Sequence, residues 1–292
     1  MQQLFQQIVG GLALGAVYAS LALALVLIYR TTQVVNFAQG EMAMFTTFIA
    51  WSLNHRMSYW AAFALTLLIA FAGGIAVERI VIRTVEHASH LTVIMVTIAM
   101  FVILNGLAGW IWSPETRSFP SPFTGNPITI GGVALGRQEL GIIGVSLGLM
   151  LLLWAFFRFT KLGLAMRAAA VGPNVSRLLG VRVGWMLALG WGFAAVLGAV
   201  SGMMVAPIVF LDPTMMQSVL IYAFAAAVLG GIESPAGAVV GGLALGVAIN
   251  LLSTYVDVVT PELELPVAFA VLIGVLLLRP AGLFGRVIVR RV

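Results

Sequence analysis

The stretch VGWMLALGWGFAAVLGAVSGMMVAPIVFL, residues 183–211, contains no charged residue. A helix needs about 20 apolar residues to cross the hydrocarbon core of a bilayer, so this stretch is long enough to span it. Seven other charge-free runs are candidate spans: 1–29, 57–77, 93–112, 140–157, 213–232, 234–256 and 265–278. A ninth candidate, 34–54, is interrupted only by Glu41. The charge-free run 118–136 is expected to be a loop because it is rich in proline and glycine.

The composition of the whole chain agrees with these runs. Hydrophobic residues make up 61% of the 292 residues and charged residues only 9%, and the mean hydropathy is +1.09. Lipid accepts only helices or closed barrels, and the apolar runs do not alternate as barrel strands do. The sequence therefore predicts an all-α polytopic membrane protein with eight or nine transmembrane helices, forming a single transmembrane domain over 1–292.

The basic character of the chain follows from its expected topology. With the C-terminus in the cytoplasm, Arg56, Arg117 and Arg137 are the only basic residues outside, and the other twelve of the 15 Lys and Arg lie inside. Cytoplasmic loops of membrane proteins carry this excess of positive charge. The net charge of +5 is therefore assigned to membrane orientation, and binding of nucleic acid is not expected.

Several chemistries lack the residues that they require. The chain has no cysteine and contains neither a GxxxxGK[ST] phosphate loop nor an HExxH motif. No set of residues suited to nucleophilic catalysis can be assembled in one layer of the membrane. We therefore expect no catalytic residues, no metal site and no enzyme activity.

Few polar residues fall inside the apolar segments, and burial makes each of them costly. Asn105 and Asn250 can act as hydrogen-bonding contacts between helices or can line a pathway. Glu41 can favour the positive N-terminal end of its helix, pair with Arg30, or form the polar face of a passage. The candidates for a translocation pathway are Asn36, Gln39, Glu41, Asn105 and Asn250.

The segment 34–54 is expected to be a short or discontinuous helix. Asn36 is a residue type that caps helices, and Gln39 follows it three residues later, as in a capping box. The sequence therefore predicts a helix that begins directly after Asn36 and runs toward Asn54.

The basic segment KLGLAMRAAAVGPNVSRLLGVRV, residues 161–183, contrasts with the apolar runs around it. Gly172 and Pro173 predict a break between two short helices, and Gly180 is a stop signal for the second helix. The segment could lie as an amphipathic helix on lipid headgroups or dock into a soluble partner. The small residues Ala168, Ala169 and Ala170 are compatible with docking.

The hexapeptide GGLALG occurs at 10–15 and again at 241–246. On the expected topology the two copies run in opposite directions through the membrane. They can mark an inverted repeat, which is common in transporters, or a chance match in a chain rich in Gly, Leu and Ala. Their small-xxx-small spacing favours close helix packing in either case.

Four segments together resemble a known family. They are VYASLALALVLIYRTTQVVNFAQGEMAMF at 17–45, KLGLAMRAAAVGPNVSRLLGV at 161–181, YAFAAAVLGGIESPAGAVVGG at 222–242 and RPAGLFG at 279–285. In these segments the chain resembles the permease subunits of bacterial ABC importers for branched-chain amino acids, of the LivH type. The similarity extends over nearly the whole chain.

The resemblance implies a function and a set of partners. Such a permease pairs with a homologous LivM-type permease and two cytoplasmic ATPase subunits, and a periplasmic binding protein delivers its substrate. ATP and magnesium are bound by the partner subunits and no cofactor by this chain. The implied location is the bacterial inner membrane, with many spans and a cytoplasmic C-terminus.

The resemblance also assigns the basic segment. The family's coupling segment, which contacts an ATPase, corresponds to about 158–184 of this chain. This sequence departs from related coupling loops because Arg167 stands near the place of their leading glutamate. The expected contacts are Arg167, Ala168, Ala169, Gly172, Leu178 and Gly180. Leu, Ile and Val are the implied substrates; urea or short amides remain alternatives, as does a stand-alone secondary transporter or channel.

Overall fold

The computed structural model describes residues 2–86, 88–130, 133–256, 259–260, 263–279 and 281–285. Its helices and strands, in chain order, are α1 (Gln2–Thr32), α2 (Gln39–Asn54), α3 (Tyr59–Val77), the π-helix η1 (Glu78–Ile82), α4 (Arg83–Val85), α5 (His90–Trp112), β1 (Ile128–Ile130), β2 (Val133–Leu135), α6 (Arg137–Phe159), α7 (Lys161–Val171), α8 (Pro173–Leu178), α9 (Val183–Val209), α10 (Met216–Gly230), α11 (Pro235–Tyr255) and α12 (Glu264–Leu278).

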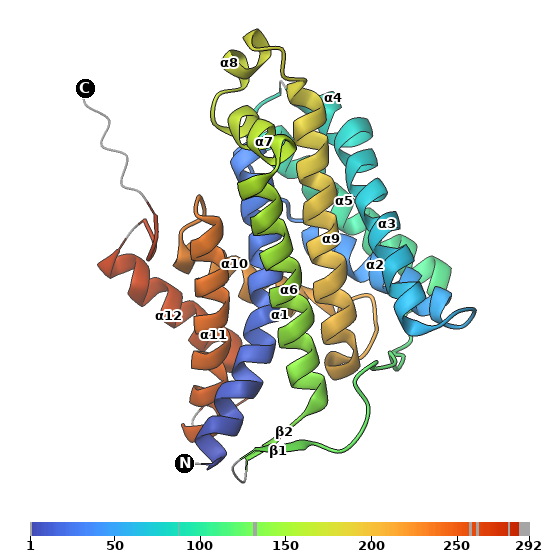
Figure 1. Cartoon of the computed structure of the whole chain (residues 1–292), viewed down its shortest axis with the longest axis vertical. Coiled ribbons are helices and arrows are strands. Elements are labelled where there is room, and N and C mark those ends of the chain that lie inside the picture. The colour runs from blue at the N-terminus through green and yellow to red at the C-terminus, as the bar shows by residue number, and fades with distance from the viewer. Residues whose placement is uncertain are drawn as a thin grey trace.

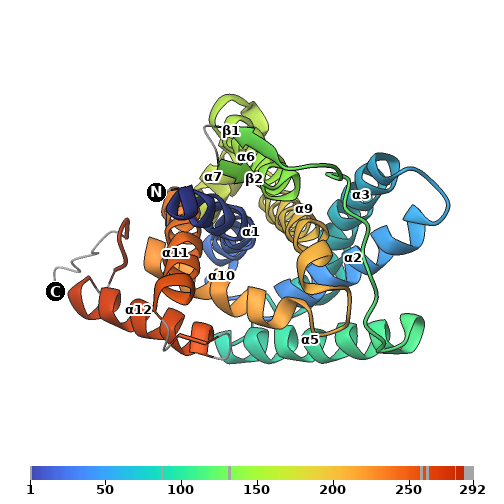
Figure 2. The ribbon, with the colours of Figure 1, turned by 90° about the horizontal axis from the view of Figure 1, so that it is seen from below.

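Helices α6, α9, α10 and α11 surround α1, whereas α3 packs on α9 and α5 packs on α2, further from α1 (Figures 1 and 2). Helix α1 is buried over most of its length. Among the described residues, six helical segments are long and apolar enough to cross a membrane: α1, α3 continued through α4, α5, α6, α9 and α11. Helices α10 and α12 are apolar but shorter. Each of the nine apolar segments predicted from the sequence is helical in the described residues, which confirms an all-α polytopic fold.

The two GGLALG segments pack against each other, in antiparallel direction. Gly11 lies against Val247, whereas Gly15, one turn later in α1, lies against Leu243, one turn earlier in α11. A Cβ atom on Gly242 would lie 2.5 Å from the Cα of Ala19. Only glycine permits such an approach of two backbones. The predicted close packing and the opposite directions of the two segments are therefore confirmed.

The run 118–136 contains a short hairpin as well as loop. Strands β1 and β2 pair antiparallel, with Ile128 opposite Leu135 and Thr129 opposite Ala134. The expected loop therefore also contains a short hairpin, because the β-branched residues 128–130 favour a strand. Arg117, earlier in the same loop, pairs with Leu211 after α9, so the loop is also fixed to the α9–α10 turn.

Helix α2 begins two residues later than its predicted cap requires. Its N-cap is Ala38, and no side chain caps it. The side-chain oxygen of Asn36 instead accepts a hydrogen bond from the Ala38 N–H at 3.1 Å, while its amide donates to the Gln39 side chain at 3.2 Å. Asn36 therefore stabilises a turn that precedes the helix, as Asn often does.

The two ends of the bundle differ in composition. Helices α7 and α8 lie at one end, together with the C-terminal end of α1, and the β1–β2 hairpin lies at the other (Figure 1). The α7–α8 end of the bundle carries several arginines at or beside helix ends: Arg30, Arg158, Arg177 and Arg182. The terminal arginines at 286, 290 and 291, which the charge count also placed there, lie outside the described residues.

Candidate functional site

Helix α7 folds back sharply from the end of α6. Thr160 separates the two helices, and its hydroxyl caps α7 by accepting from the Gly163 N–H at 2.9 Å. A Cβ atom on Gly163 would lie 2.5 Å from the carbonyl oxygen of Phe156 and 2.6 Å from the Cα of Phe157. A glycine at this position therefore allows the close contact that sets the direction of α7.

The predicted break between two short helices is confirmed. Helix α7 ends at Val171, and Pro173 is the first residue of α8, where its missing N–H is tolerated. Gly180 adopts φ +81°, a left-handed conformation that ends the second helix as predicted. The segment is thus two rigid pieces joined at Gly172.

The α7–α8 pair presents large apolar side chains to its surroundings. We call Val171, Val175, Leu178 and Leu179 the apolar tip; their exposed fractions are 79%, 62%, 88% and 78%. Helices α7 and α8, which carry or adjoin these residues, lie at the extreme end of the bundle (Figure 1). An exposed group of aliphatic side chains at such a place is typical of a protein interface.

The six predicted coupling residues are distributed over two faces. Ala168, Leu178 and Gly180 are exposed and Gly172 is half-exposed, whereas Ala169 is buried against the bundle. Arg167 is half-buried and lines a cavity between α7 and the long helices. The sequence analysis missed Val171 and Val175, which lie on either side of the Gly172–Pro173 break, so no single helical periodicity connects them.

A cavity of about 210 Å³ lies beneath the α7–α8 pair. Its lining includes Thr31 of α1, Glu78 of η1, Ala169 of α7 and Trp191 of α9. An ion pair of Arg177 with Glu86, at 3.9 Å, connects α8 to the segment after α4. Helix α7 thus packs on α6, α9 and α1, whereas α8 has fewer contacts with the bundle and a cavity separates part of the pair from it.

Two of the predicted pathway residues stabilise the start of α2. Gln39 is fully buried and donates from its Nε2 to the carbonyl oxygen of Ala194 in α9 at 2.9 Å. Asn36 is also buried and bonds to Gln39. Together they fix the start of α2 against the middle of α9.

Glu41 lies with Asn105, in contrast to the expected alternative of a pair with Arg30. The Nδ2 of Asn105 donates to Glu41 Oε2 at 3.3 Å and to the carbonyl oxygen of Pro213 at 2.8 Å. Glu41 is only 1% exposed. Asn105 therefore connects α2, α5 and the segment between α9 and α10.

Asn250 is separate from the other four candidates. Its Nδ2 donates to the carbonyl oxygen of Gln7 at 2.6 Å and to the Gln7 side chain at 2.9 Å. This geometry joins α11 to the start of α1 and matches the interhelical contact considered for it from the sequence.

The starts of α2 and α10 meet inside the bundle. Gly40, in the first turn of α2, packs against Met216 and Leu220, in the first turns of α10. Helix α10 has 15 residues and is therefore about 22 Å long, which is shorter than the full apolar spans. The two short helices therefore begin beside each other, next to Asn36, Gln39 and Glu41.

Replacement of Asn105 by leucine tests this connection. Asn105→Leu is expected to lower the free energy of unfolding by about 1–3 kcal/mol, because the Glu41 carboxylate loses its donor in a buried place. Glu41→Gln combined with Asn105→Leu should recover part of the loss, since a neutral amide costs less to bury. Thermal unfolding in detergent measures both effects, and an Asn105→Leu protein as stable as the parent contradicts the assigned role.

A bundle of long apolar helices around a buried first helix defines a multi-pass helical membrane protein. The chain belongs to the family described as branched-chain amino acid transport system / permease component, which matches residues 7–276. This is a family of transport permeases, and membership implies a transport system with further subunits.

Curated relatives match nearly the whole chain. The high-affinity branched-chain amino acid transport system permease protein LivH of Salmonella typhimurium is 31% identical, over 98% of this chain and 97% of its own length. The permease protein BraD of Pseudomonas aeruginosa, described in the same terms, is 32% identical over the same shares. The probable LivH of Methanocaldococcus jannaschii is 27% identical over 91% of this chain and 87% of its own. Among solved structures, PsaBC from Streptococcus pneumoniae in complex with Fab gives a TM-score of 0.48 at 12% identity, over 92% of this chain and 88% of that one.

Proposed function

We propose that this chain is the membrane-spanning permease subunit of an ATP-driven importer for branched-chain amino acids. The observation that carries the proposal is the exposed apolar tip on α7–α8, at the basic end of a bundle that belongs to this permease family. A protein that works alone has no need to expose Leu178 and Leu179 beyond its helical bundle. A protein moved by a soluble partner requires such a surface.

The proposed partners follow from the subunit arrangement of such importers. They are a homologous LivM-type permease, two cytoplasmic ATPase subunits that bind ATP and magnesium, and a periplasmic protein that delivers the substrate. Because the substrate is delivered, the permease needs little affinity of its own, and the small number of polar residues inside the bundle agrees with this role.

We infer that the α7–α8 end faces the cytoplasm of a bacterial cell and that the C-terminus lies on the same side. The arginines at that end support this orientation by the positive-inside rule. Eight or nine helices would then cross the membrane, with α2 and α10 as short helices that begin beside each other. The antiparallel contact of the two GGLALG segments supports an inverted repeat of α1 and α11.

The junction of α2 and α10 is the proposed place of the pathway. Discontinuous helices often meet at the substrate site of a transporter. The polar side chains at this junction are those of Asn36, Gln39, Glu41 and Asn105. Asn250 belongs to the pathway only if the pathway extends toward the start of α1. Closure of the ATPases would move α7–α8, and the cavity beneath these helices would accommodate the motion.

The proposal is tested by reconstitution. The chain is inserted into liposomes with its partner permease, ATPases and binding protein, and uptake of radiolabelled leucine is measured with and without ATP. We expect uptake only with ATP and with all subunits present. Leucine uptake by the chain alone, without ATP, would instead assign it to secondary transporters or channels. Uptake of urea or a short amide in place of leucine would retain the permease role and reject the proposed substrate.

A further inference from the structure

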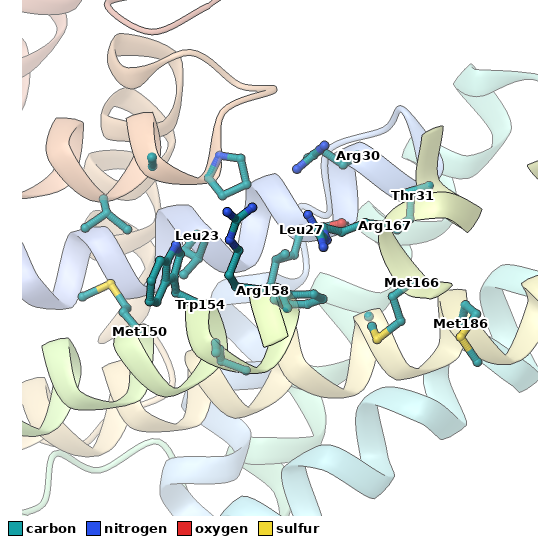
Figure 3. Close-up of a pocket in the computed structure, with 17 residues that line it drawn as sticks. Leu23, Leu27, Arg30, Thr31, Met150, Trp154, Arg158, Met166, Arg167 and Met186 are labelled. Carbon is teal, nitrogen blue, oxygen red and sulfur yellow. Dashed lines mark hydrogen bonds between the residues drawn. The ribbon is translucent and has the colours of Figure 1, made fainter. Parts of the chain in front are cut away.

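A second cavity lies next to the first one described, and Thr31 and Ala170 line both. It has a volume of about 350 Å³ and is bounded by α1, α6, α7, α9 and the start of α11 (Figure 3). It lies at the α7–α8 end of the bundle, where the long helices α1 and α6 end. In a protein that spans the bilayer, the ends of long apolar helices are expected near the lipid headgroups.

Three guanidinium groups from three different helices line this cavity: Arg30 of α1, Arg158 of α6 and Arg167 of α7 (Figure 3). The described residues that line it include no aspartate or glutamate. Within the part of the chain that the structure describes, the ion pairs at 4.0 Å or less are Arg79 with Glu78 and Arg177 with Glu86, so none of the three arginines has a carboxylate partner. The cavity therefore concentrates positive charge that the described residues do not neutralise.

One of these groups also has an unsatisfied donor. The Nε of Arg167 is buried and has no hydrogen-bond partner among the described residues. A buried donor of a charged group without an acceptor is costly. The start of α11, with Pro235 and Ala236 in the lining, adds the positive end of a helix dipole.

The rest of the lining is predominantly apolar. It includes Leu23 and Leu27 of α1, Met150 and Trp154 of α6, and Val239 of α11. Figure 3 shows Leu23, Met150 and Trp154 further along the helices than the cluster of Arg30 and Arg167. The cavity thus joins a cationic part to an apolar part that follows the long helices.

We propose that this cavity binds an anionic phospholipid, with the headgroup phosphate at Arg30, Arg158 and Arg167 and an acyl chain along the apolar lining. Basic pockets between membrane helices on the cytoplasmic side suit such headgroups. An amino acid fits less well, because its ammonium group would find no carboxylate in the lining. A free phosphate would leave the apolar part unused. Since Arg167 lies on α7, the lipid would join this helix to α1 and α6.

The test compares ligands on the purified protein in a neutral detergent, assembled with any subunits that copurify. Phosphatidylglycerol, phosphatidylcholine, inorganic phosphate and leucine are titrated separately, and native mass spectrometry counts the bound molecules. We expect phosphatidylglycerol to bind at least ten-fold more tightly than phosphatidylcholine and to be displaced by high salt. Equal affinity for the two lipids overturns the proposal. An inorganic phosphate affinity as high as that of phosphatidylglycerol also overturns it.

Variants assign the site to the cavity. Arg30→Gln with Arg158→Gln should weaken phosphatidylglycerol binding at least ten-fold, whereas the corresponding lysine pair should retain most of it. Arg182→Gln removes an exposed charge at the same end, outside this cavity, and should leave binding unchanged. Thermal unfolding verifies that each variant is folded. The lipid site is refuted if the double glutamine variant binds phosphatidylglycerol as tightly as the parent does. It is also refuted if crosslinking shows an acidic segment of an ATPase in this cavity in place of lipid. Because lipid binding needs no transport, this result does not depend on the substrate or on the proposed function.

Discussion

Leu178→Glu is expected to abolish ATP-driven uptake without affecting the fold. Leu178 is 88% exposed at the apolar tip, so the substitution removes little packing from the bundle itself. In a docked complex the same position would bury a carboxylate among Val175 and Leu179. Loss of one central interface residue costs about 2 kcal/mol or more, which is roughly a 30-fold weaker interaction, and a buried charge adds to this.

Uptake in proteoliposomes and copurification of the ATPase subunits measure the effect of Leu178→Glu. Ala88→Glu is the matched control, because it adds the same charge to an exposed position near the same end, outside the tip. Leu178→Met should retain uptake, since its side chain is apolar and of similar size. Normal uptake by Leu178→Glu would remove the apolar tip from the docking surface, whereas loss of uptake in Ala88→Glu as well would indicate a general effect of charge.

Gly242→Ala is expected to have the largest effect on stability. The added methyl group would lie 2.5 Å from the Cα of Ala19 and 2.7 Å from its Cβ, so α1 and α11 would have to separate. Overpacking of this kind costs about 1–3 kcal/mol, and a contact between two backbones cannot be relieved by a change of rotamer. We expect an effect at the upper end of that range, about 3 kcal/mol.

Thermal unfolding and the yield of folded protein in detergent measure the effect of Gly242→Ala. Gly144→Ala provides the control, because a Cβ atom there meets no atom within 4 Å and the position is exposed on α6. Its stability should be unchanged or slightly raised, since alanine favours a helix more than glycine does. Equal stability of the two variants would mean that α1 and α11 are not in backbone contact.

The helical segments were predictable from sequence because the bilayer imposes one rule on every span. A segment such as 183–211, without charges, can satisfy its backbone in lipid only as a helix. The Gly172–Pro173 break was predictable for a similarly local reason. The hairpin of β1 and β2 was missed because proline and glycine around it indicated a loop, and three residues per strand give a weak signal.

Contacts between distant segments could not be predicted in the same way. The sequence offered Arg30 as a partner of Glu41 because the two are near in the chain. The turn before α2 instead places Glu41 beside Asn105, which lies 64 residues later. Likewise, the resemblance implied Arg167 only as a contact with an ATPase, and only the packing of α7 on α1 and α6 brings it together with Arg30 and Arg158.

The contact between Gly15 and Gly246 also constrains how the chain is made. Helix α1 leaves the ribosome early, but its partner α11 follows only roughly 230 residues later, which at about 5–20 residues per second takes on the order of 10–50 s. During that interval the glycine face of α1 must be held by lipid, by α6 and α9, or by the insertion machinery. Although α1 is made first, it is among the last helices to complete its packing. In variants whose α11 cannot pack, the glycine face of α1 would stay exposed, and cellular quality control would recognise it.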